Sequence, residues 1–452
     1  MERNVKRNRY AFGLGTIGRD MLYTLVSIYF MYYLTDVLNL PDSTMWYMTG
    51  VMTVLRIFDA VNDPLMGVLV DNTHTRWGKF KPWIAIGGLA SASLTVLMFS
   101  DFGLQGTGYV ISFVFIYLGW DLAYGANDIA FWSMLPALTI DQTEREKTGS
   151  FARICASIGM YIAVIGIPGV TRAMGDTTQA WFIVAVALAL IMLAFLAFPL
   201  LGIKGESSLV KAESTPLREL FNVLFKNDQL LYTAVSMALF MIGYVTTTSF
   251  GIYFFKYAFK DENMYMVFAG ILGISQIAAL SVFPVFTKRY TRKQLYGFAT
   301  LLVVAGYIIF FFSPMNMIPI GLSGILLFTG QAFIQVLMLM FLADTVEYGQ
   351  WKLGRRNESI TFSVQPFINK IGGAIASGIV GATLIISGIN AANTPAEVTQ
   401  NGLLILKMAM LILPLLFITA GYLVYRAKFK IDKKMYETII TELRARGDFE
   451  QD

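Results

Sequence analysis

The feature that most constrains this chain is a succession of long apolar stretches, each of a length that crosses a lipid bilayer as a helix. A transmembrane helix needs about 20 largely apolar residues. Only 14% of the 452 residues are charged and 56% are hydrophobic, whereas soluble proteins carry about 25% charged residues. Because this is too little charge to cover the surfaces of soluble domains, we expect an all-helical membrane protein.

The apolar stretches predict twelve spans in two groups of six. They lie near residues 10–37, 44–70, 83–101, 108–136, 152–172, 179–202, 229–257, 266–286, 296–313, 317–345, 363–388 and 404–426. We expect an N-terminal half at 1–203, a cytoplasmic linker at 204–228, a C-terminal half at 229–426 and a cytoplasmic tail at 427–452.

Basic residues mark one side of these spans. Lys and Arg gather at the N-terminus, in the loops after every second span and in the C-terminal tail. Because cytoplasmic loops carry the excess of Lys and Arg, both termini are expected in the cytoplasm. The N-terminus passes directly into a long span without a small-residue cleavage site, so we expect no removable signal peptide.

The two halves resemble each other in one loop. Residues 71–81 after the second span and 287–293 after the eighth are both short and basic. Two similar six-helix halves are typical of major facilitator transporters, which hold their substrate between the halves near the middle of the membrane. A channel or a membrane enzyme with twelve helices remains open at this point.

Composition excludes several other classes of protein. The single histidine, His74, and the single cysteine, Cys155, leave no disulfide framework, no Cys/His zinc site and no histidine-based acid–base catalysis. The excess of 35 Lys and Arg over 30 Asp and Glu is too small for a nucleic-acid-binding protein. We therefore expect no nucleic-acid partner. An enzyme would need a nucleophile–base pair or a metal site on a polar loop, and because the sequence shows neither, we expect no enzyme activity and no cofactor.

The second predicted span carries charges that do not belong in lipid. Asp59 and Asp63 are one helical turn apart, and Arg56 shares their face. An ionisable side chain at membrane depth faces a cavity and is functional by default. Two carboxylates beside one guanidinium suit a Na⁺ site or a shared proton. The alternative is a buried ion pair that only holds helices together.

The fourth predicted span carries a polar and aromatic stripe. Tyr124, Asp128 and Trp132 recur every four residues, and Asp121 lies seven residues before Asp128. Carboxylates accept hydrogen bonds from sugar hydroxyls, and aromatic rings cover the apolar face of a pyranose. The stripe therefore favours sugar binding, although Trp132 alone could be an interfacial anchor.

Further charges lie inside other predicted spans. They are the adjacent pair Arg19 and Asp20, then Arg153, and Lys370 with the polar Gln365 on the same span. Among the groups expected at depth, five acids stand against four bases, so one bound cation or proton would neutralise the remaining charge.

Several segments resemble the glycoside–pentoside–hexuronide:cation symporters, the family of the melibiose permease and the lactose transporters of lactic-acid bacteria. The resemblance covers nearly the whole chain, and its specific segments are residues 56–67, 76–83, 128–136, 144–146 and 343–352. It implies the major facilitator fold and a transporter of the bacterial cytoplasmic membrane.

The resemblance also implies roles for individual residues. Asp59, Asp63 and Asp128 would bind the coupling cation, acting as metal ligands if that cation is Na⁺, and Asn62 would affect which cation is accepted. The implied sugar-site residues are Arg19, Asp20, Asp121, Tyr124, Asp128, Trp132, Arg153, Gln365 and Lys370. Gating or coupling would involve Arg56, Asp71, Arg76, Lys79, Asp344, Glu347 and Glu358.

Three departures from the melibiose permease pattern narrow the expected substrate. A threonine associated with Na⁺ is Gly125 here, a tryptophan that flanks the sugar is Gln335, and Asp121 is acidic as in lactose-type members. We therefore expect a galactoside di- or oligosaccharide, coupled to Na⁺ or H⁺, carried by a monomer in the lipid bilayer. The alternatives are a pentoside or hexuronide symporter, a lipid or drug transporter, and a sugar sensor that transports nothing.

Overall fold

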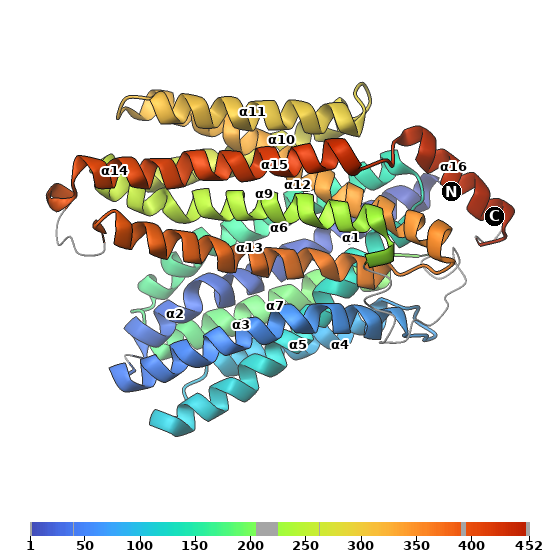
Figure 1. The fold of residues 1–452 in the computed structure, drawn as a ribbon. Helices are drawn as coiled ribbons and strands as arrows, with labels where there is room; N and C mark the ends of the chain where they lie inside the picture. Colours follow the sequence, from blue (N-terminus) through green and yellow to red (C-terminus); the bar gives the residue numbers. More distant parts are fainter. Residues whose placement is uncertain (1, 39, 205–224, 262, 390–394, 449–452) are drawn as a thin grey trace. The chain divides into compact units, whose positions relative to one another are not determined.

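The computed structural model describes residues 2–38, 40–204, 225–261, 263–389 and 395–448, apart from some side chains near the N-terminus and between residues 35 and 61. The regular structure of this described part is helical throughout, as the sequence predicts (Figure 1). Each of the twelve predicted spans is covered by a helix, in places continued by a π-helical turn.

Ten helices of the described chain are long and apolar enough to cross a membrane by length and composition. The predicted spans at residues 10–37 and 44–70 fall on α1 (Glu2–Thr24), with its short continuations to residue 37, and on α3 (Asp42–Asp71). The all-helical membrane architecture is therefore confirmed.

The chain divides into two compact units. The first contains Met1–Val223, Gly349–Val364 and Glu442–Asp452, and the second contains Leu224–Tyr348 and Gln365–Thr441. Two short segments from the C-terminal part of the sequence thus belong to the first unit. The predicted boundaries at residues 203, 228 and 426 stay a prediction.

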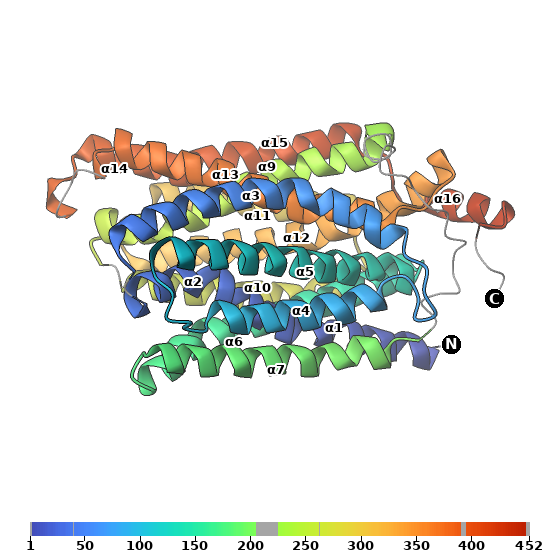
Figure 2. The same ribbon diagram turned by 90° about the horizontal axis from the view of Figure 1, so that it is seen from below.

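The first unit is built around α1 and α5. Helix α5 spans Gly106–Leu138. Besides α3, the remaining elements are η1 (Leu25–Tyr29), α2 (Phe30–Tyr32), η2 (Tyr33–Val37), α4 (Lys81–Met98), α6 (Gln142–Ala173) and α7 (Thr178–Gly202). Helix α1 packs against α6 and α7, and α5 packs against α3 and α4. Figure 2 shows α1, α6 and α7 side by side.

Close approach to α1 depends on glycines. A Cβ at Gly159 of α6 would lie 2.3 Å from the carbonyl oxygen of Ile17, and one at Gly18 would lie 2.6 Å from Cα of Met192 on α7. Both contacts are with backbone, so neither position has room for a side chain. The glycines therefore bring α6 and α7 against α1 next to Arg19.

The second unit contains α9 (Asp228–Tyr253), which packs lengthwise against α15 (Leu413–Lys428). Its other elements are η4 (Phe254–Ala258), α10 (Met264–Phe286), α11 (Arg292–Phe312), η6 (Pro395–Glu397), α14 (Gln400–Lys407) and η7 (Met408–Ile412). Three helices extend across a boundary between the units: α12 (Met317–Leu353), α13 (Glu358–Ile386) and α16 (Lys433–Ala445).

Candidate functional site

The centre of the site in the first unit is Arg19 on α1. Its guanidinium is 1% exposed; it donates from Nε to Asn127 Oδ1 at 2.8 Å and forms an ion pair with Asp128. Asn127 in turn donates to the carbonyl oxygen of Ile84 on α4 at 2.8 Å. A buried guanidinium is costly unless it is paired and hydrogen-bonded, so these two residues of α5 hold Arg19 in place.

Aromatic rings surround the two arginines of this site. The Arg19 guanidinium lies 4.3 Å from the ring centre of Phe131 and 5.9 Å from that of Tyr124. The Arg153 guanidinium of α6 lies 4.6 Å from the ring of Trp132. Trp132 therefore packs against a charged member of the cluster rather than standing alone as an interfacial anchor.

A stack of three rings borders the cluster. Tyr124 stacks on Trp120 at 5.3 Å, and Tyr23 of α1 stacks on Tyr124 at 5.2 Å. Trp120 is fixed by its indole N–H, which donates to Thr95 Oγ1 of α4 at 3.0 Å. Tyr23 is 45% exposed and is the most accessible ring of the stack.

Asp20 and Arg153 complete the charges of the cluster. Electrostatic interactions join the half-buried Asp20 carboxylate to Arg19, Asp128 and Arg153. Two donor atoms of the cluster, Nη1 of Arg19 and Nε of Arg153, are buried without a hydrogen-bond partner among the described residues. Because unsatisfied buried donors are costly, these two atoms are available to donate hydrogen bonds to oxygen atoms of a ligand.

Two predicted cation ligands lie in the interior of the first unit. Asp63 is 1% and Asn62 is 6% exposed. A Cβ at Gly125 of α5 would lie 3.7 Å from Asp63 Oδ1, which places Asp63 beside the segment that carries Asp128. Asp121 on α5 is buried as well.

The side chains of Arg56 and Asp59 lie outside the described ones. Among the described residues, no group of three or more His, Cys, Asp and Glu side chains is arranged to hold a metal ion. Because Asp59 is not in that set, the cation site of Asp59, Asp63, Asp128 and Asn62 stays a prediction.

A second polar network joins the end of α3 to the start of α13 within the first unit. Asp71 accepts hydrogen bonds from the backbone N–H groups of Ser359 at 3.0 Å and Ile360 at 2.9 Å. Lys79 lies between the carboxylates of Asp71, at 2.5 Å, and Glu358, at 2.9 Å. A Cβ at Gly67 would lie 2.8 Å from the Ser359 carbonyl oxygen, so α3 and α13 are in close contact here.

The same network caps the end of α5. Arg356 pairs with Glu358 and donates to the Pro136 carbonyl oxygen at 3.2 Å, while the buried Arg145 donates to the Thr139 carbonyl oxygen at 3.0 Å. Cations at a helix C-terminus satisfy carbonyls that have no partner in the helix. We call the group Asp71, Lys79, Arg356 and Glu358 the α3–α13 junction.

Burial lowers the pKa of the Lys79 ammonium, but the neighbouring carboxylates of Asp71 and Glu358 outweigh it and hold that pKa above its ordinary value of 10.5. Arg76, in the same loop, is exposed. Three of the predicted gating residues therefore lie in one network, and Arg76 lies at the surface.

The remaining predicted residues lie in the second unit. Asp344 of α12 pairs with Arg292 of α11, and Glu347 is fully buried on α12. Gln365 and Lys370 are half-buried on α13. Their place in a sugar or gating site stays a prediction.

Sequence reasoning did not select Asn127 or Arg356. Asn127 is adjacent to Asp128 but lies on the neighbouring face of α5, which packs on α4, so it falls outside the stripe of Tyr124, Asp128 and Trp132. A polar amide in the middle of an apolar span was the available signal. In the sequence, Arg356 is one of the basic loop residues that indicate membrane orientation. Its hydrogen bond to the Pro136 carbonyl oxygen is visible only in the structure.

Comparisons with solved structures show the fold. The chain aligns with the major facilitator superfamily transporter FucP in its outward conformation with a TM-score of 0.65 and 12% identity, covering 94% of this chain and 99% of that one. It aligns with the proton:xylose symporter XylE with a TM-score of 0.66 and 13% identity, covering 97% and 99%. The major facilitator fold predicted from the sequence is confirmed.

Sequence comparisons show the family. The chain is 31% identical to the lactose permease of Lactobacillus helveticus over 98% of its own length and 73% of the relative's. It is 31% identical to the raffinose carrier protein of Pediococcus pentosaceus over 96% and 71%. Residues 11–433 match the family described as MFS/sugar transport protein. The chain therefore belongs to this family of transporters, not enzymes, and is a sugar symporter of the major facilitator superfamily in a multi-pass membrane topology.

Proposed function

We propose that this symporter imports a neutral galactoside di- or oligosaccharide together with Na⁺ or H⁺. Two of its relatives are a lactose permease and a raffinose carrier, and both of those sugars contain a galactosyl ring. We also propose that the sugar is imported across the bacterial cytoplasmic membrane, as the resemblance to the glycoside–pentoside–hexuronide:cation symporters implies. We further propose cytoplasmic termini, from the distribution of basic residues, and a functional monomer.

The observation that carries the sugar assignment is the cluster around Arg19. It combines unused buried donors on Arg19 and Arg153, a carboxylate on Asp20 and the partly exposed ring of Tyr23. Donors and carboxylates bind sugar hydroxyls, and an aromatic face covers the apolar side of a pyranose. In this proposal Asp20, Asp121, Tyr124, Asp128, Trp132 and Arg153 contact the sugar, with Gln365 and Lys370 contributing from α13.

Coupling in this proposal depends on Asp128. Its carboxylate neutralises Arg19 in the sugar cluster, and Gly125, one turn away on the same helix, borders Asp63. A Na⁺ or proton bound at Asp59, Asp63 and Asp128 changes the electrostatic environment of Arg19. It therefore changes the affinity of the Arg19 cluster for sugar. Linkage requires the sugar to raise the cation affinity by the same factor.

The α3–α13 junction is proposed as a gate in the alternating-access cycle. Its two carboxylates share one ammonium, and Asp71 caps the first turn of α13. Such charge-assisted contacts can be broken and remade when the transporter changes state. Opening the α3–α13 junction then releases the start of α13 from the end of α3.

The test is uptake of labelled lactose, raffinose and methyl β-galactoside into proteoliposomes, with and without Na⁺, while external pH is recorded. Lactose or raffinose accumulation above equilibrium supports the proposal. Alkalinisation on sugar addition identifies H⁺, and Na⁺-stimulated uptake without alkalinisation identifies Na⁺. Protein that moves none of these sugars would contradict the galactoside assignment.

A hexuronide is the second candidate substrate. The Arg153 guanidinium has an unused buried Nε atom and could pair with the carboxylate of an anionic sugar. A relative at 25% identity is the glucuronide carrier protein homolog of Escherichia coli. Uptake of a glucuronide that exceeds uptake of lactose in the same vesicles would favour this alternative.

A further inference from the structure

Asn127 of α5 carries a buried amide with a partner at each end. The side chain is fully buried; its Oδ1 accepts a hydrogen bond from Arg19 Nε at 2.8 Å, and its Nδ2 donates to the Ile84 carbonyl oxygen at 2.8 Å. A guanidinium can only donate and a carbonyl oxygen can only accept. Turning the amide over would break both hydrogen bonds, so its orientation is fixed.

Two glycines of α4 allow this short side chain to reach its partner. A Cβ at Gly87 would lie 2.6 Å from the Ala123 carbonyl oxygen and 3.2 Å from Asn127 Cβ, and one at Gly88 would lie 3.2 Å from Asn127 Nδ2. The backbone of α4 therefore lies directly against the amide. Packing and hydrogen bonding together hold Asn127 in one position.

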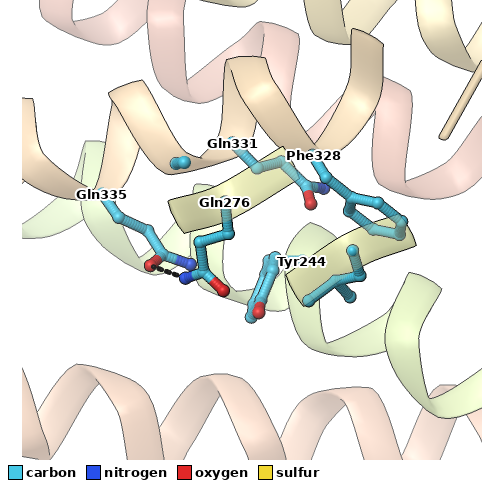
Figure 3. Close-up of a pocket in the computed structure, with 7 residues that line it drawn as sticks. Tyr244, Gln276, Phe328, Gln331 and Gln335 are labelled. Carbon is cyan, nitrogen blue, oxygen red and sulfur yellow. Dashed lines mark hydrogen bonds between the residues drawn. The ribbon is translucent and has the colours of Figure 1, made fainter. Parts of the chain in front are cut away.

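The amides of the second unit are held less firmly. Three glutamines, two aromatic rings and two apolar side chains line a small pocket between α9, α10 and α12, which we call the amide pocket (Figure 3): Tyr244, Leu272, Gln276, Phe328, Gln331, Ala332 and Gln335. Gln276 Nε2 donates to Gln335 Oε1 at 3.5 Å, and Gln331 Nε2 donates to the Tyr307 hydroxyl at 3.4 Å. Hydrogen bonds of this length are weak, in contrast to the two short ones of Asn127.

The amide of Asn127 also determines where Arg19 can donate. Nε and Nη2 lie on one edge of the planar guanidinium, where Asn127 accepts from Nε and Asp128 accepts from Nη2. Nη1 is buried without a hydrogen-bond partner among the described residues. Because the guanidinium is a rigid plane, holding one edge also sets the direction in which Nη1 donates.

The two acceptors on that edge differ in charge and in access. The carboxylate side chain of Asp128 is 25% exposed, whereas the neutral Asn127 is fully buried. An incoming cation can therefore compete with Arg19 for Asp128 but not for Asn127. The hydrogen bond from Arg19 Nε to Asn127 remains when the charge at Asp128 changes.

We propose that Asn127 is a positioning residue for coupling, which keeps Arg19 Nη1 directed at the sugar when the cation binds the carboxylate of Asp128. The inference rests on the proposed function, because it requires a sugar at the Arg19 cluster and a cation at Asp128. Asp20 is the other acid that interacts electrostatically with Arg19. Without Asn127, cation binding at Asp128 lets the guanidinium turn toward Asp20, and sugar affinity falls mainly in the cation-bound state.

Two variants separate positioning of Arg19 from packing against α4. Asn127→Leu keeps a similar shape but removes both hydrogen bonds. Asn127→Asp keeps an acceptor for Arg19 Nε but cannot donate to the Ile84 carbonyl oxygen. Ser133→Ala is the matched control, because Ser133 is also buried on α5 and its hydroxyl donates to the Ile129 carbonyl oxygen of the same helix.

The dissociation constant for lactose is measured by calorimetry on the purified full chain in lipid nanodiscs, with and without Na⁺ and at two pH values, and Tm reports folding. With the cation bound, Asn127→Leu should weaken lactose binding about ten- to a hundredfold, the scale of a lost hydrogen bond to a charged group. Without the cation the loss should stay below about threefold, because Asp128 still holds Arg19. Asn127→Asp should regain most of the lost affinity, and Ser133→Ala should change nothing.

A packing role alone predicts a different pattern. Unchanged binding in Asn127→Leu, equal losses with and without the cation, or a loss in Asn127→Asp as large as in Asn127→Leu would overturn the inference. If Asn127→Leu does not fold, a loss above about tenfold in folded Asn127→Asp would overturn it as well. Unmodified protein whose lactose affinity is the same under all cation conditions would instead overturn the proposed coupled transport.

Discussion

The Arg19 cluster and the amide pocket use opposite means of holding polar groups inside apolar helices. In the first unit, guanidinium groups and carboxylates of Arg19, Asp128, Asp20 and Arg153 compensate one another. In the second unit, the amides of Gln276, Gln331 and Gln335 are neutral and rest on long hydrogen bonds. The first region contains charged groups, whereas the second contains only neutral groups that can form hydrogen bonds.

This difference assigns separate tasks to the two regions. A site that responds to a cation needs charges whose balance the cation can alter, and the carboxylate of Asp128 beside Arg19 meets that need. The neutral lining of the amide pocket carries no charge whose balance a cation can alter. Changes in the charged cluster should therefore affect coupling and binding, whereas changes in the neutral pocket should leave the cation dependence of transport unchanged.

The largest effect is expected for Asp128→Asn. Removing the carboxylate leaves the buried Arg19 without its ion-pair partner, and breaking a buried pair in this way costs about 3–5 kcal/mol. Sugar affinity and cation-coupled uptake should both fall by more than about a hundredfold. Binding by calorimetry and uptake in proteoliposomes measure the two losses.

Asp101→Asn is the control for this change. Asp101 is exposed and accepts a hydrogen bond from the Gly103 backbone N–H, which an asparagine oxygen can also accept. It should leave binding and uptake unchanged. Normal galactoside accumulation by Asp128→Asn would remove the distinction between the charged and the neutral region.

A smaller effect is expected at the α3–α13 junction, which carries charge but touches no sugar in this account. Asp71→Ala removes both backbone caps on α13 and one partner of Lys79. Uptake should fall about tenfold while the dissociation constant for lactose changes less than about threefold, since couplings of this kind amount to about 1–3 kcal/mol.

Asp71→Asn sharpens the same test, because an amide oxygen keeps one acceptor while the charge is lost. Uptake by Asp71→Asn should therefore lie between uptake by the unmodified protein and uptake by Asp71→Ala. If lactose binding falls in parallel with uptake in both variants, the junction is part of the binding site and not a gate.

A still smaller effect, on the Na⁺ stimulation of uptake, is expected for Gly125→Ser. A Cβ there would be in ordinary contact with Asp63 Oδ1 at 3.7 Å, so a hydroxyl fits beside the carboxylate. Because oxygen ligands favour Na⁺, Na⁺ stimulation of uptake should rise about two- to fivefold. Gly125→Ala adds the carbon without the oxygen and should show no rise. An equal rise in both variants would exclude a role for the hydroxyl.

The smallest effect is a pH dependence of stability at Lys79. Its pKa is raised above 10.5 in the folded protein, so its contribution is complete below the unfolded pKa and is lost as the pH rises through the folded pKa. The difference in Tm between the unmodified protein and Lys79→Met should be constant from about pH 6 to 9 and shrink only above about pH 10.5. A difference that shrinks already between pH 7 and 9 would show that the two carboxylates do not hold the proton on Lys79.

The length of the apolar stretches predicted the helices, and the spacing of polar residues predicted part of the site. The four-residue spacing of Tyr124, Asp128 and Trp132 correctly indicated one face of α5, because that spacing returns to the same side of a helix. The sequence did not show that Arg19 pairs with Asp128 and Asn127 of another helix. Neighbouring side chains such as Arg19 and Asp20 point in different directions on a helix, so adjacency did not reveal the partner.

Contacts between segments that are far apart in the sequence could not be predicted from the sequence either, because they depend on how the helices pack. Asp71 caps Ser359 and Ile360, nearly 290 positions further along the chain. Gln276 and Gln331 are polar residues in two separate apolar helices, and only the packing of α10 against α12 brings them into one pocket. Such pairings depend on helix packing, which local patterns do not encode.

The proposed function requires that movement of a galactoside is coupled to movement of a cation. The most direct measurement is accumulation of labelled lactose in proteoliposomes of the unmodified chain, with an inward Na⁺ gradient or an inward proton gradient imposed separately. We predict accumulation above the external concentration with at least one gradient, and simple equilibration when both are collapsed. Equilibration under every gradient, or no lactose entry at all, would contradict the account.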